Sequence, residues 1–209
     1  MKKGFAAFFI LLFLLAGCTG VLPLVKDSTP SVSLSEPNQP DSSGAASSSS
    51  VADFFDTAGP AEDESGLPGS YTVPEGWVKA EQYSTDEKIF YVQGGHQDDP
   101  APDNISINVG TNRYSAQEHE TFREAIVRQL LAQLQGSGAE LTGDGTHTEQ
   151  GYIVYIFTIE ESDAVTKQYY ILDDYRYCLV HLTSFTGEED AYQAAQTIAD
   201  SFVWADKED

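Results

Sequence analysis

KQYYILDDYRYCLVHLTSF, residues 167–185, contains two runs of aromatic and aliphatic residues with Asp173 and Asp174 between them. Runs rich in Tyr, Ile, Leu and Val are typical of β-strands, and an Asp pair between two such runs favours a tight turn. The stretch therefore predicts a β-hairpin. A hairpin is not stable by itself in water, so further strands are expected to pair with it.

Four stretches before the hairpin supply candidate strands. Residues 104–110 (NISINVG) alternate apolar and polar side chains, which is typical of a half-buried strand. Residues 151–161 (GYIVYIFTIEE) are apolar at both parities, which predicts a strand in the centre of the sheet. Residues 88–95 (KIFYVQGG) and 139–150 (AELTGDGTHTEQ) predict a strand ending in a glycine pair and a strand followed by a loop.

Two segments have the pattern of amphipathic helices. Ser115 to Glu118 and Thr186 to Glu189 each have the spacing of a capping box, in which two side chains bond free N–H groups at a helix start. An apolar stripe follows each box. The glycines around Ser137 are expected to end the first helix. The stripe residues are Phe122, Ile126, Val127, Leu130, Leu131 and Leu134 in the first helix, and Ala191, Ala195, Ile198 and Phe202 in the second, which leads to Trp204.

Strands separated by helices without strict alternation predict an α+β fold, an antiparallel sheet with helices packed on it. The motif YTVPEGW at residues 71–77 has a turn at Val73 to Gly76, and the chain closes with a helix ending in IADSF, residues 198–202. With the late hairpin, these features resemble the PsbP-like family over residues 71–204. The resemblance implies an α/β/α sandwich. Because PsbP assists the assembly of a membrane complex, it also implies an accessory or scaffolding role.

The first 17 residues have the pattern of a signal peptide. Lys2 and Lys3 precede a run of 12 apolar residues, Phe5 to Ala16, which is too short to span a bilayer comfortably. The next residues, Leu15-Ala16-Gly17-Cys18, resemble the lipobox of bacterial lipoproteins. This resemblance implies cleavage before Cys18 and lipid attachment to its thiol. We therefore expect a protein held on the extracytoplasmic side of the cell membrane.

Residues 18–70 are rich in Ser, Pro, Gly and acidic residues, which predicts a disordered linker between the lipid and the folded domain. Residues 51–56 (VADFFD) interrupt this composition. Phe54 and Phe55 either cluster transiently or dock on the domain or a partner. Residues 71–204 are expected to form one globular domain, and residues 205–209 a polar tail.

The chain has 11 basic and 33 acidic residues and a net charge of −22. Removing residues 1–17 takes away two lysines and no acidic residue, which leaves −24. Nucleic acid and anionic lipid headgroups repel a chain that is this acidic. Neither is therefore an expected partner. The same charge favours a monomer.

Cys18 and Cys178 are the two cysteines of the sequence. If Cys18 carries lipid, Cys178 has no partner for an intramolecular disulfide. With a plain secretory signal the two could form one. Cys178 shares its parity with Val180 and Leu182, so we expect a buried, inert thiol rather than a redox or nucleophilic one.

Two loops raise the question of metal binding. His96, Asp98, Asp99 and Asp103 lie in one loop, and Asp144, His147 and Glu149 in another. Neither has the ligand spacing of an EF-hand, and the four histidines, His96, His119, His147 and His181, lack zinc-helix spacing. Solvated loop charge is the favoured interpretation, with no metal and no cofactor, and a divalent-metal module is the alternative.

Tyrosines offer the other candidate surface. Adjacent residues of a strand point to opposite faces, so Tyr169 and Tyr170 are expected on opposite faces and Tyr175 and Tyr177 on a shared one. These rings either pack under a helix or bind a sugar or peptide. We expect a noncatalytic domain that binds an envelope protein or a small ligand. A hydrolase using His147 or a redox enzyme using Cys178 is the remaining alternative.

Overall fold

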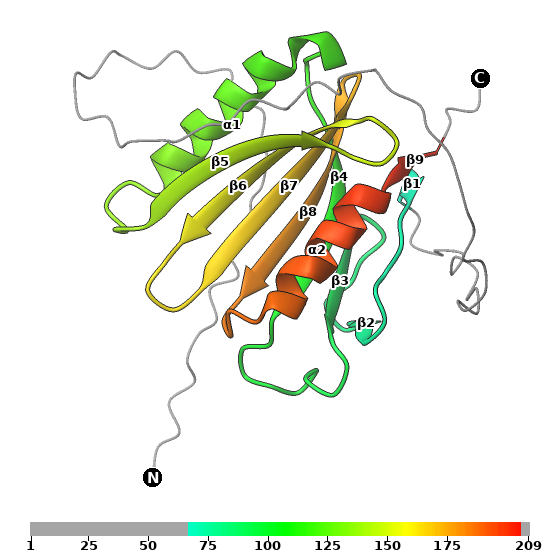
Figure 1. Ribbon diagram of the computed structural model, residues 1–209, viewed down its shortest axis with the longest axis vertical. Helices are drawn as coiled ribbons and strands as arrows, with labels where there is room; N and C mark the ends of the chain where they lie inside the picture. Colours follow the sequence, from blue (N-terminus) through cyan, green and yellow to red (C-terminus); the bar gives the residue numbers. More distant parts are fainter. Residues whose placement is uncertain (1–66, 206–209) are drawn as a thin grey trace, which may run out of the picture. The chain divides into compact units, whose positions relative to one another are not determined.

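The computed structural model describes residues 67–205. Seven strands form one sheet in the order β2-β3-β4-β8-β7-β6-β5, and every neighbouring pair is antiparallel (Figure 1). The strands are β2 (Trp77–Lys79), β3 (Lys88–Gln93), β4 (Asn104–Thr111), β5 (Glu140–His147), β6 (Ile153–Glu160), β7 (Val165–Asp173) and β8 (Arg176–Ser184). The predicted antiparallel sheet is confirmed.

The described helices lie on opposite faces of this sheet. β4 is followed by the 3-10 turn η1 (Ala116–Glu118) and by α1 (His119–Gln133), which crosses to β5 at the far edge. α1 packs on the face that carries Tyr155, Phe157 and Tyr170. α2 (Glu189–Ser201) packs on the other face, against β4, β8 and part of β7. The fold is therefore the α/β/α sandwich with helices packed on an antiparallel sheet.

The hairpin of residues 167–185 forms as predicted, with its turn one residue later. Asp173 pairs with Arg176 in the β7–β8 register, so Asp174 and Tyr175 make the turn. Tyr175 adopts a φ of 60°, and its side chain is 57% exposed. The prediction that Tyr175 and Tyr177 share a face was wrong, because a turn residue does not continue the alternation of a strand. Tyr177 is buried beneath α1.

The sequence predicts that β6 lies at the centre of the sheet, and this prediction was wrong. It lies beside the edge strand β5, and β8 occupies the central position. β6 is nevertheless apolar on both faces, for two separate reasons. Phe157 and its neighbours of the same parity are covered by α1, and Val154 belongs to the core beneath α2. An apolar pattern on both faces of a strand therefore indicates that other elements cover both faces, and it does not indicate where the strand lies in the sheet.

The first capping box forms, but it caps the 3-10 turn η1, whereas α1 begins three residues later with Glu118 as N-cap and no side-chain cap hydrogen bond. The Ser115 N–H donates to Glu118 Oε2 at 3.1 Å, and the Ser115 hydroxyl donates to the same oxygen at 2.9 Å. The stripe residues Phe122, Ile126 and Leu130 are buried against the sheet. Gly136, with a φ of 84°, follows the helix end, where a left-handed residue is favoured.

The second capping box was a wrong prediction. α2 begins at Glu189, with Glu188 as N-cap and no side-chain hydrogen bond from that cap. Thr186 instead donates its hydroxyl to Asp103 Oδ2 at 2.6 Å and accepts the Glu188 N–H at 3.1 Å. The predicted stripe of α2 is confirmed, since its four predicted residues are at most 2% exposed: Ala191, Ala195, Ile198 and Phe202.

A two-stranded sheet closes the described chain on itself. β1 (Gly69–Ser70) pairs antiparallel with β9 (Val203–Trp204), so the two ends of the described chain lie side by side (Figure 1). Phe202 stacks on Tyr71 and makes an edge contact with Trp204. The signal peptide, Cys18, Phe54 and Phe55 lie outside the described residues, as do most of the linker and tail.

Candidate functional site

One half of the sheet face that carries α2 is left open by that helix. α2 packs on β8 and on adjoining parts of β4 and β7, while β5, residues 156–160 of β6 and the start of β7 continue beyond it on the same face. Two adjoining hollows of about 320 and 500 Å³ occupy this open half. We call them together the groove. It is lined by Thr142, Asp144 and Thr146 of β5, Ile156, Thr158 and Glu160 of β6, Val165, Lys167 and Tyr169 of β7, and Glu189, Tyr192 and Gln196 of α2.

The two hollows share four lining residues, Thr158, Lys167, Tyr169 and Gln196. Strand alternation explains why the sheet residues among them lie together. Thr158 pairs with Lys167 across β6 and β7, and Ile156 pairs with Tyr169. Paired residues of neighbouring strands point to the same face. The register of the β6–β7 hairpin therefore places the side chains of Ile156, Thr158, Lys167 and Tyr169 on the floor of the groove.

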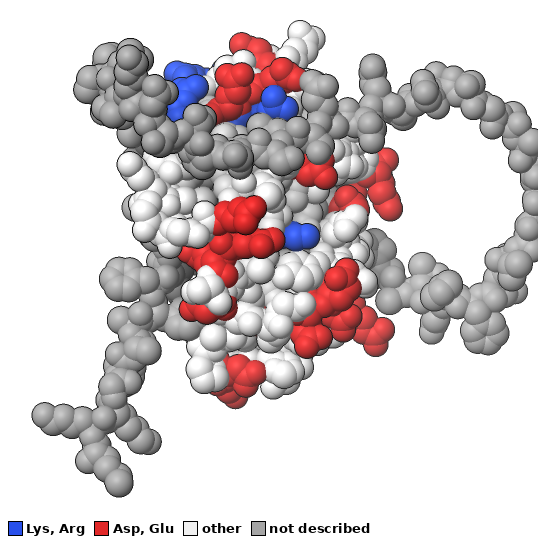
Figure 2. Space-filling view, turned by 60° about the vertical axis from the view of Figure 1, so that its left-hand side comes forward, with Lys and Arg blue, Asp and Glu red and all other residues white. Residues whose placement is uncertain are grey.

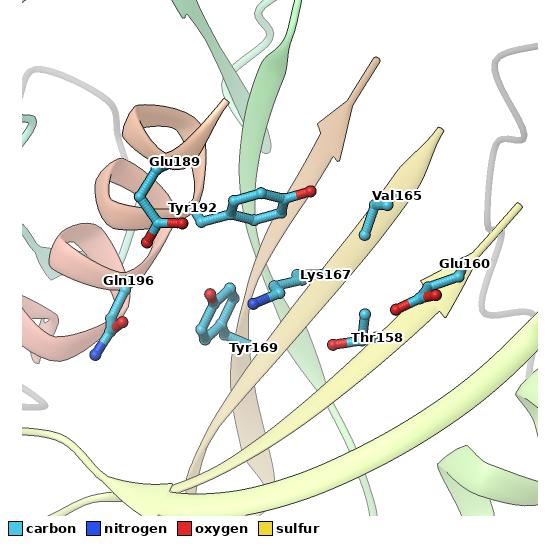
Figure 3. Close-up of a pocket in the computed structure, with 8 residues that line it drawn as sticks. All are labelled: Thr158, Glu160, Val165, Lys167, Tyr169, Glu189, Tyr192 and Gln196. Carbon is cyan, nitrogen blue, oxygen red and sulfur yellow. The ribbon is translucent and has the colours of Figure 1, made fainter. Parts of the chain in front are cut away.

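Lys167 extends from this floor toward α2. Its Nζ lies over the Tyr192 ring, 4.7 Å from the ring centroid, and Figure 3 shows the two side chains converging between helix and sheet. An ammonium over an aromatic face is attracted by the ring's quadrupole. Lys167 makes no ion pair within residues 67–205. The groove thus already holds one ammonium beside an aromatic ring.

Tyr169, also on the floor, directs its side chain toward α2 (Figure 3). Burial, and then the Asp200 carboxylate and Tyr192, raise the pKa of Tyr169 to about 12. The phenol is therefore neutral at physiological pH and can donate or accept a hydrogen bond. Burial also raises the pKa of Asp200, and the Glu149 carboxylate adds to that rise.

The rim of the groove is acidic. Asp144, Glu160 and Glu189 come from three different elements, and their side chains are exposed. Lys167 is the single basic residue among the lining residues. Figure 2 shows that acidic side chains also predominate elsewhere on the visible face of the domain. A ligand that enters the groove meets carboxylates first and tyrosines, threonines and Lys167 below them.

The first predicted acidic loop is divided by the structure into two unlike parts. His96 Nδ1 lies 2.7 Å from Asp99 Oδ2 at the surface, and Asp98 is exposed. Asp103, by contrast, is 6% exposed and is not solvated loop charge. It accepts four hydrogen bonds, from Ser184 Oγ, the Phe185 N–H, and both the N–H and the hydroxyl of Thr186. Asp103 therefore fixes the β8–α2 connection.

The second predicted loop is split between the groove and its surroundings. Asp144 lines the groove, His147 ends β5, and the Glu149 N–H donates to the Asp200 carbonyl at 3.2 Å. Within residues 67–205 no three His, Cys, Asp or Glu side chains are grouped so that they could hold a metal ion.

The remaining histidines and Cys178 lie away from the groove. His119 Nδ1 lies 2.7 Å from the Tyr155 hydroxyl at the start of α1. His181 lies on β8, and burial, with a smaller effect of Lys88, lowers its pKa to about 4. The Cys178 thiol is 0% exposed beneath α2, and burial raises its pKa. The predicted core position of Cys178 is confirmed.

Opposite placement of Tyr169 and Tyr170 is confirmed, with Tyr170 beneath α1 and Tyr169 on the α2 side. The sequence did not identify Lys167, Tyr192 or Gln196 as site residues. Lys167 and Tyr192 lie 25 positions apart, in a strand and a helix whose relative placement no local pattern encodes. An isolated Lys at an inward parity of β7 was the one available signal.

No family model matches the sequence, and no curated protein matches it. The described fold is similar to the solution structure of cyanobacterial PsbP (CyanoP) from Synechocystis sp. PCC 6803, with a TM-score of 0.44, 12% identity, and coverage of 74% of this chain and 98% of that chain. It is also similar to a crystal structure from Bacteroides thetaiotaomicron VPI-5482, with a TM-score of 0.38 and 11% identity, covering 68% of this chain and 47% of that one. Likeness at this level establishes neither family membership nor function.

Proposed function

We propose that this protein is an extracytoplasmic lipoprotein, anchored through lipid on Cys18, whose domain binds a partner at the groove without catalysing a reaction. The observation that carries the binding role is the open half-face itself. Lys167, Tyr169 and Tyr192 converge in a hollow on a sheet face that α2 otherwise covers. Amphipathic rings beside polar groups are characteristic of recognition surfaces.

The lining of the groove supports binding rather than catalysis. None of its described residues is His, Cys or Ser, and its Asp, Glu, Lys and Thr residues show no hydrogen-bonded nucleophile–base pair. The raised pKa of Tyr169 keeps its phenol protonated, and the rim carboxylates are exposed. The Cys178 thiol is buried in the opposite part of the same face, so it does not supply a nucleophile to the groove.

The anchor rests on the sequence Leu15-Ala16-Gly17-Cys18 after a basic and then apolar segment. Within residues 67–205 no helix is long and apolar enough to cross a membrane. A lipid on Cys18 would hold the domain near the membrane surface, with residues 19–66 between the two. An envelope protein is the partner class that such a location favours.

The anchor is tested by intact mass and membrane fractionation of the protein expressed in a bacterial host, beside Cys18→Ser. We expect a diacylglyceryl mass on Cys18 and membrane attachment, both lost in the variant. An unmodified mature chain in the medium would overturn the anchor and make a diffusible secreted protein the better interpretation.

The binding role is tested by placing a photo-crosslinking amino acid at Thr158, inside the groove, in the cells that make the protein. Asp98, exposed outside the groove, is the matched control position. We expect a discrete adduct from Thr158 and none of the same mass from Asp98. Tyr192→Ala should remove the adduct, because it removes the ring that closes the groove. Identical adducts from both positions, or none from either, would contradict the proposal.

A further inference from the structure

The edge of the sheet borders the groove. β5 is an edge strand of the described sheet, paired with β6 on one side and with no described strand on the other (Figure 1). An edge strand presents N–H and C=O groups to which another extended chain can bond. Three of the four even-numbered residues of β5, Thr142, Asp144 and Thr146, line the groove. A strand added to β5 would therefore extend the floor of the groove.

β5 carries little to block such an addition. Edge strands are commonly protected by charged side chains, proline or a bulge. GDGTH at residues 143–147 has no lysine or proline, and its one carboxylate, Asp144, has the sign that attracts a basic segment. The Gly145 N–H donates to Asp144 Oδ1 at 2.8 Å, and this contact is exposed. A side chain that bonds the adjacent backbone amide can rotate away when another acceptor arrives. Glycine within a strand also permits close approach of a second backbone.

The charge of the groove selects the side chains of such a segment. Three rim carboxylates, Asp144, Glu160 and Glu189, outnumber the one ammonium of Lys167. The whole chain carries a net charge of −22, so the long-range field has the same sign as the rim. Such a field accelerates the approach of a cation and repels an anion. Lys167 over Tyr192 demonstrates that an ammonium fits between the helix and the sheet.

We infer that the groove binds an extended basic segment of a partner protein, which adds as a strand to β5 and places Lys or Arg side chains beside Asp144, with Glu160 and Glu189 adding negative charge farther across the groove. Strand addition supplies main-chain hydrogen bonds, and alternate side chains supply specificity. This inference rests on the proposed function, because it names the class of partner for the same groove.

The probe is a capped octapeptide of alternating Lys and Val, whose length matches the eight residues of β5. Binding to the full mature chain, prepared as Cys18→Ser, is measured by calorimetry. A Glu-Val octapeptide of the same length is the charge control. We expect binding of the Lys-Val peptide that weakens as salt increases, and no binding of the Glu-Val peptide.

Groove variants locate the binding. Asp144→Asn, Glu160→Gln and Glu189→Gln together should weaken binding of the Lys-Val peptide about tenfold or more, since the carboxylate beside the added strand and two further negative charges of the groove are lost. The matched triple variant Glu75→Gln, Glu87→Gln and Asp98→Asn makes the same change of charge at exposed positions outside the groove, and a change below about threefold is expected there. Equal weakening in both triples would overturn the inference, because binding would then follow net charge alone.

Lys167→Met provides a change of opposite sign. It removes the ammonium that repels a basic ligand and keeps most of the stem over Tyr192, so binding of the Lys-Val peptide should tighten by up to about threefold. Weaker binding in Lys167→Met would indicate that the ligand needs the ammonium. That result would overturn a basic occupant in favour of an anionic or neutral one.

N-methylation tests the strand pairing. Two versions of the peptide carry N-methyl groups on odd or on even residues, and a strand bonds its neighbour along one edge only. One version should lose binding and the other should keep it. If both bind or both fail, strand addition is wrong. If the Thr158 adduct forms in cells but excess Lys-Val peptide does not reduce it, the basic segment is wrong and the groove remains a binding site.

Discussion

The two halves of the sheet face that carries α2 differ in what covers them. Under α2, Ile105, Val180 and Leu182 are fully excluded from solvent. A few strands away on the same face, Thr142, Asp144 and Thr158 line an open groove. Seven strands spaced about 4.8 Å apart span about 29 Å, whereas a helix is about 10 Å across, so one helix covers only part of the face. Strand alternation fixes which residues share a face, and helix placement determines whether that face becomes core or site.

The largest expected contrast between the halves is the protection of Cys178. In the Cys18→Ser chain it is the only thiol, fully buried, with a pKa raised by burial. Labelling with a disulfide reagent should be slower than in urea-unfolded protein by about a thousandfold or more, since reaction requires opening of the covered half. A cysteine introduced as Thr158→Cys in the groove, with Cys178→Ala, should label readily. Fast labelling of native Cys178 would show that α2 does not cover β8 persistently.

Truncation of a core residue should separate the halves in stability. Leu182→Ala is expected to lower the free energy of unfolding by about 2–5 kcal/mol, because it leaves a cavity beneath α2. Thr158→Ala, in the open half of the face, should change it by less than about 0.5 kcal/mol. Urea denaturation followed by tryptophan fluorescence measures both. Equal losses would mean that Thr158 contributes to a packed core.

Asp103 and Asp98 sharpen the comparison within a single loop. Asp103→Ala removes the acceptor of four hydrogen bonds in the β8–α2 connection, and we expect a loss of about 2–3 kcal/mol in the free energy of unfolding. Asp98→Ala should have almost no effect, since that side chain is exposed. The same urea titration compares them. A silent Asp103→Ala would assign the start of α2 to its packing rather than to this carboxylate.

Local patterns predicted the elements of this fold well. The hairpin of residues 167–185, the stripes of both helices and the burial of Cys178 follow from periodicities of 2 and 3.6, which each short segment carries by itself. The capping box at Ser115 is likewise local, because both partners lie within four residues.

The errors and omissions involve partners distant in sequence. Thr186 has the spacing of a capping residue, but it bonds a carboxylate 83 positions away. β6 has the composition of a central strand because α1, which ends 20 positions before β6 begins, covers its second face. The groove joins β5, β6 and β7 to α2 and exists only through their assembly. No local pattern reports where a helix stops covering a sheet.

On the opposite face of the sheet, pH tests the burial of a single histidine. α1 covers Tyr155, Phe157 and Tyr170, whereas His181 lies on the same face between Ser106 and Gln168 of its neighbouring strands. Burial, and then Lys88, lower the pKa of His181 from 6.5 to about 4 in the folded state. As pH falls below 6.5, His181 binds a proton in the unfolded chain but not in the folded chain. The free energy of unfolding therefore decreases progressively down to about pH 4.

His181→Gln keeps a polar side chain that does not titrate. Urea midpoints measured between pH 7 and pH 4 should fall less steeply for the variant than for the parent chain, while the titration of surface carboxylates contributes equally to both. Above pH 7, where His181 is neutral in the folded and the unfolded chain, the urea midpoints of variant and parent should change with pH in the same way. Parallel curves across the whole range would show that His181 takes up its proton equally in the folded and unfolded chains, which would mean that water reaches this part of the face as freely as it reaches the groove.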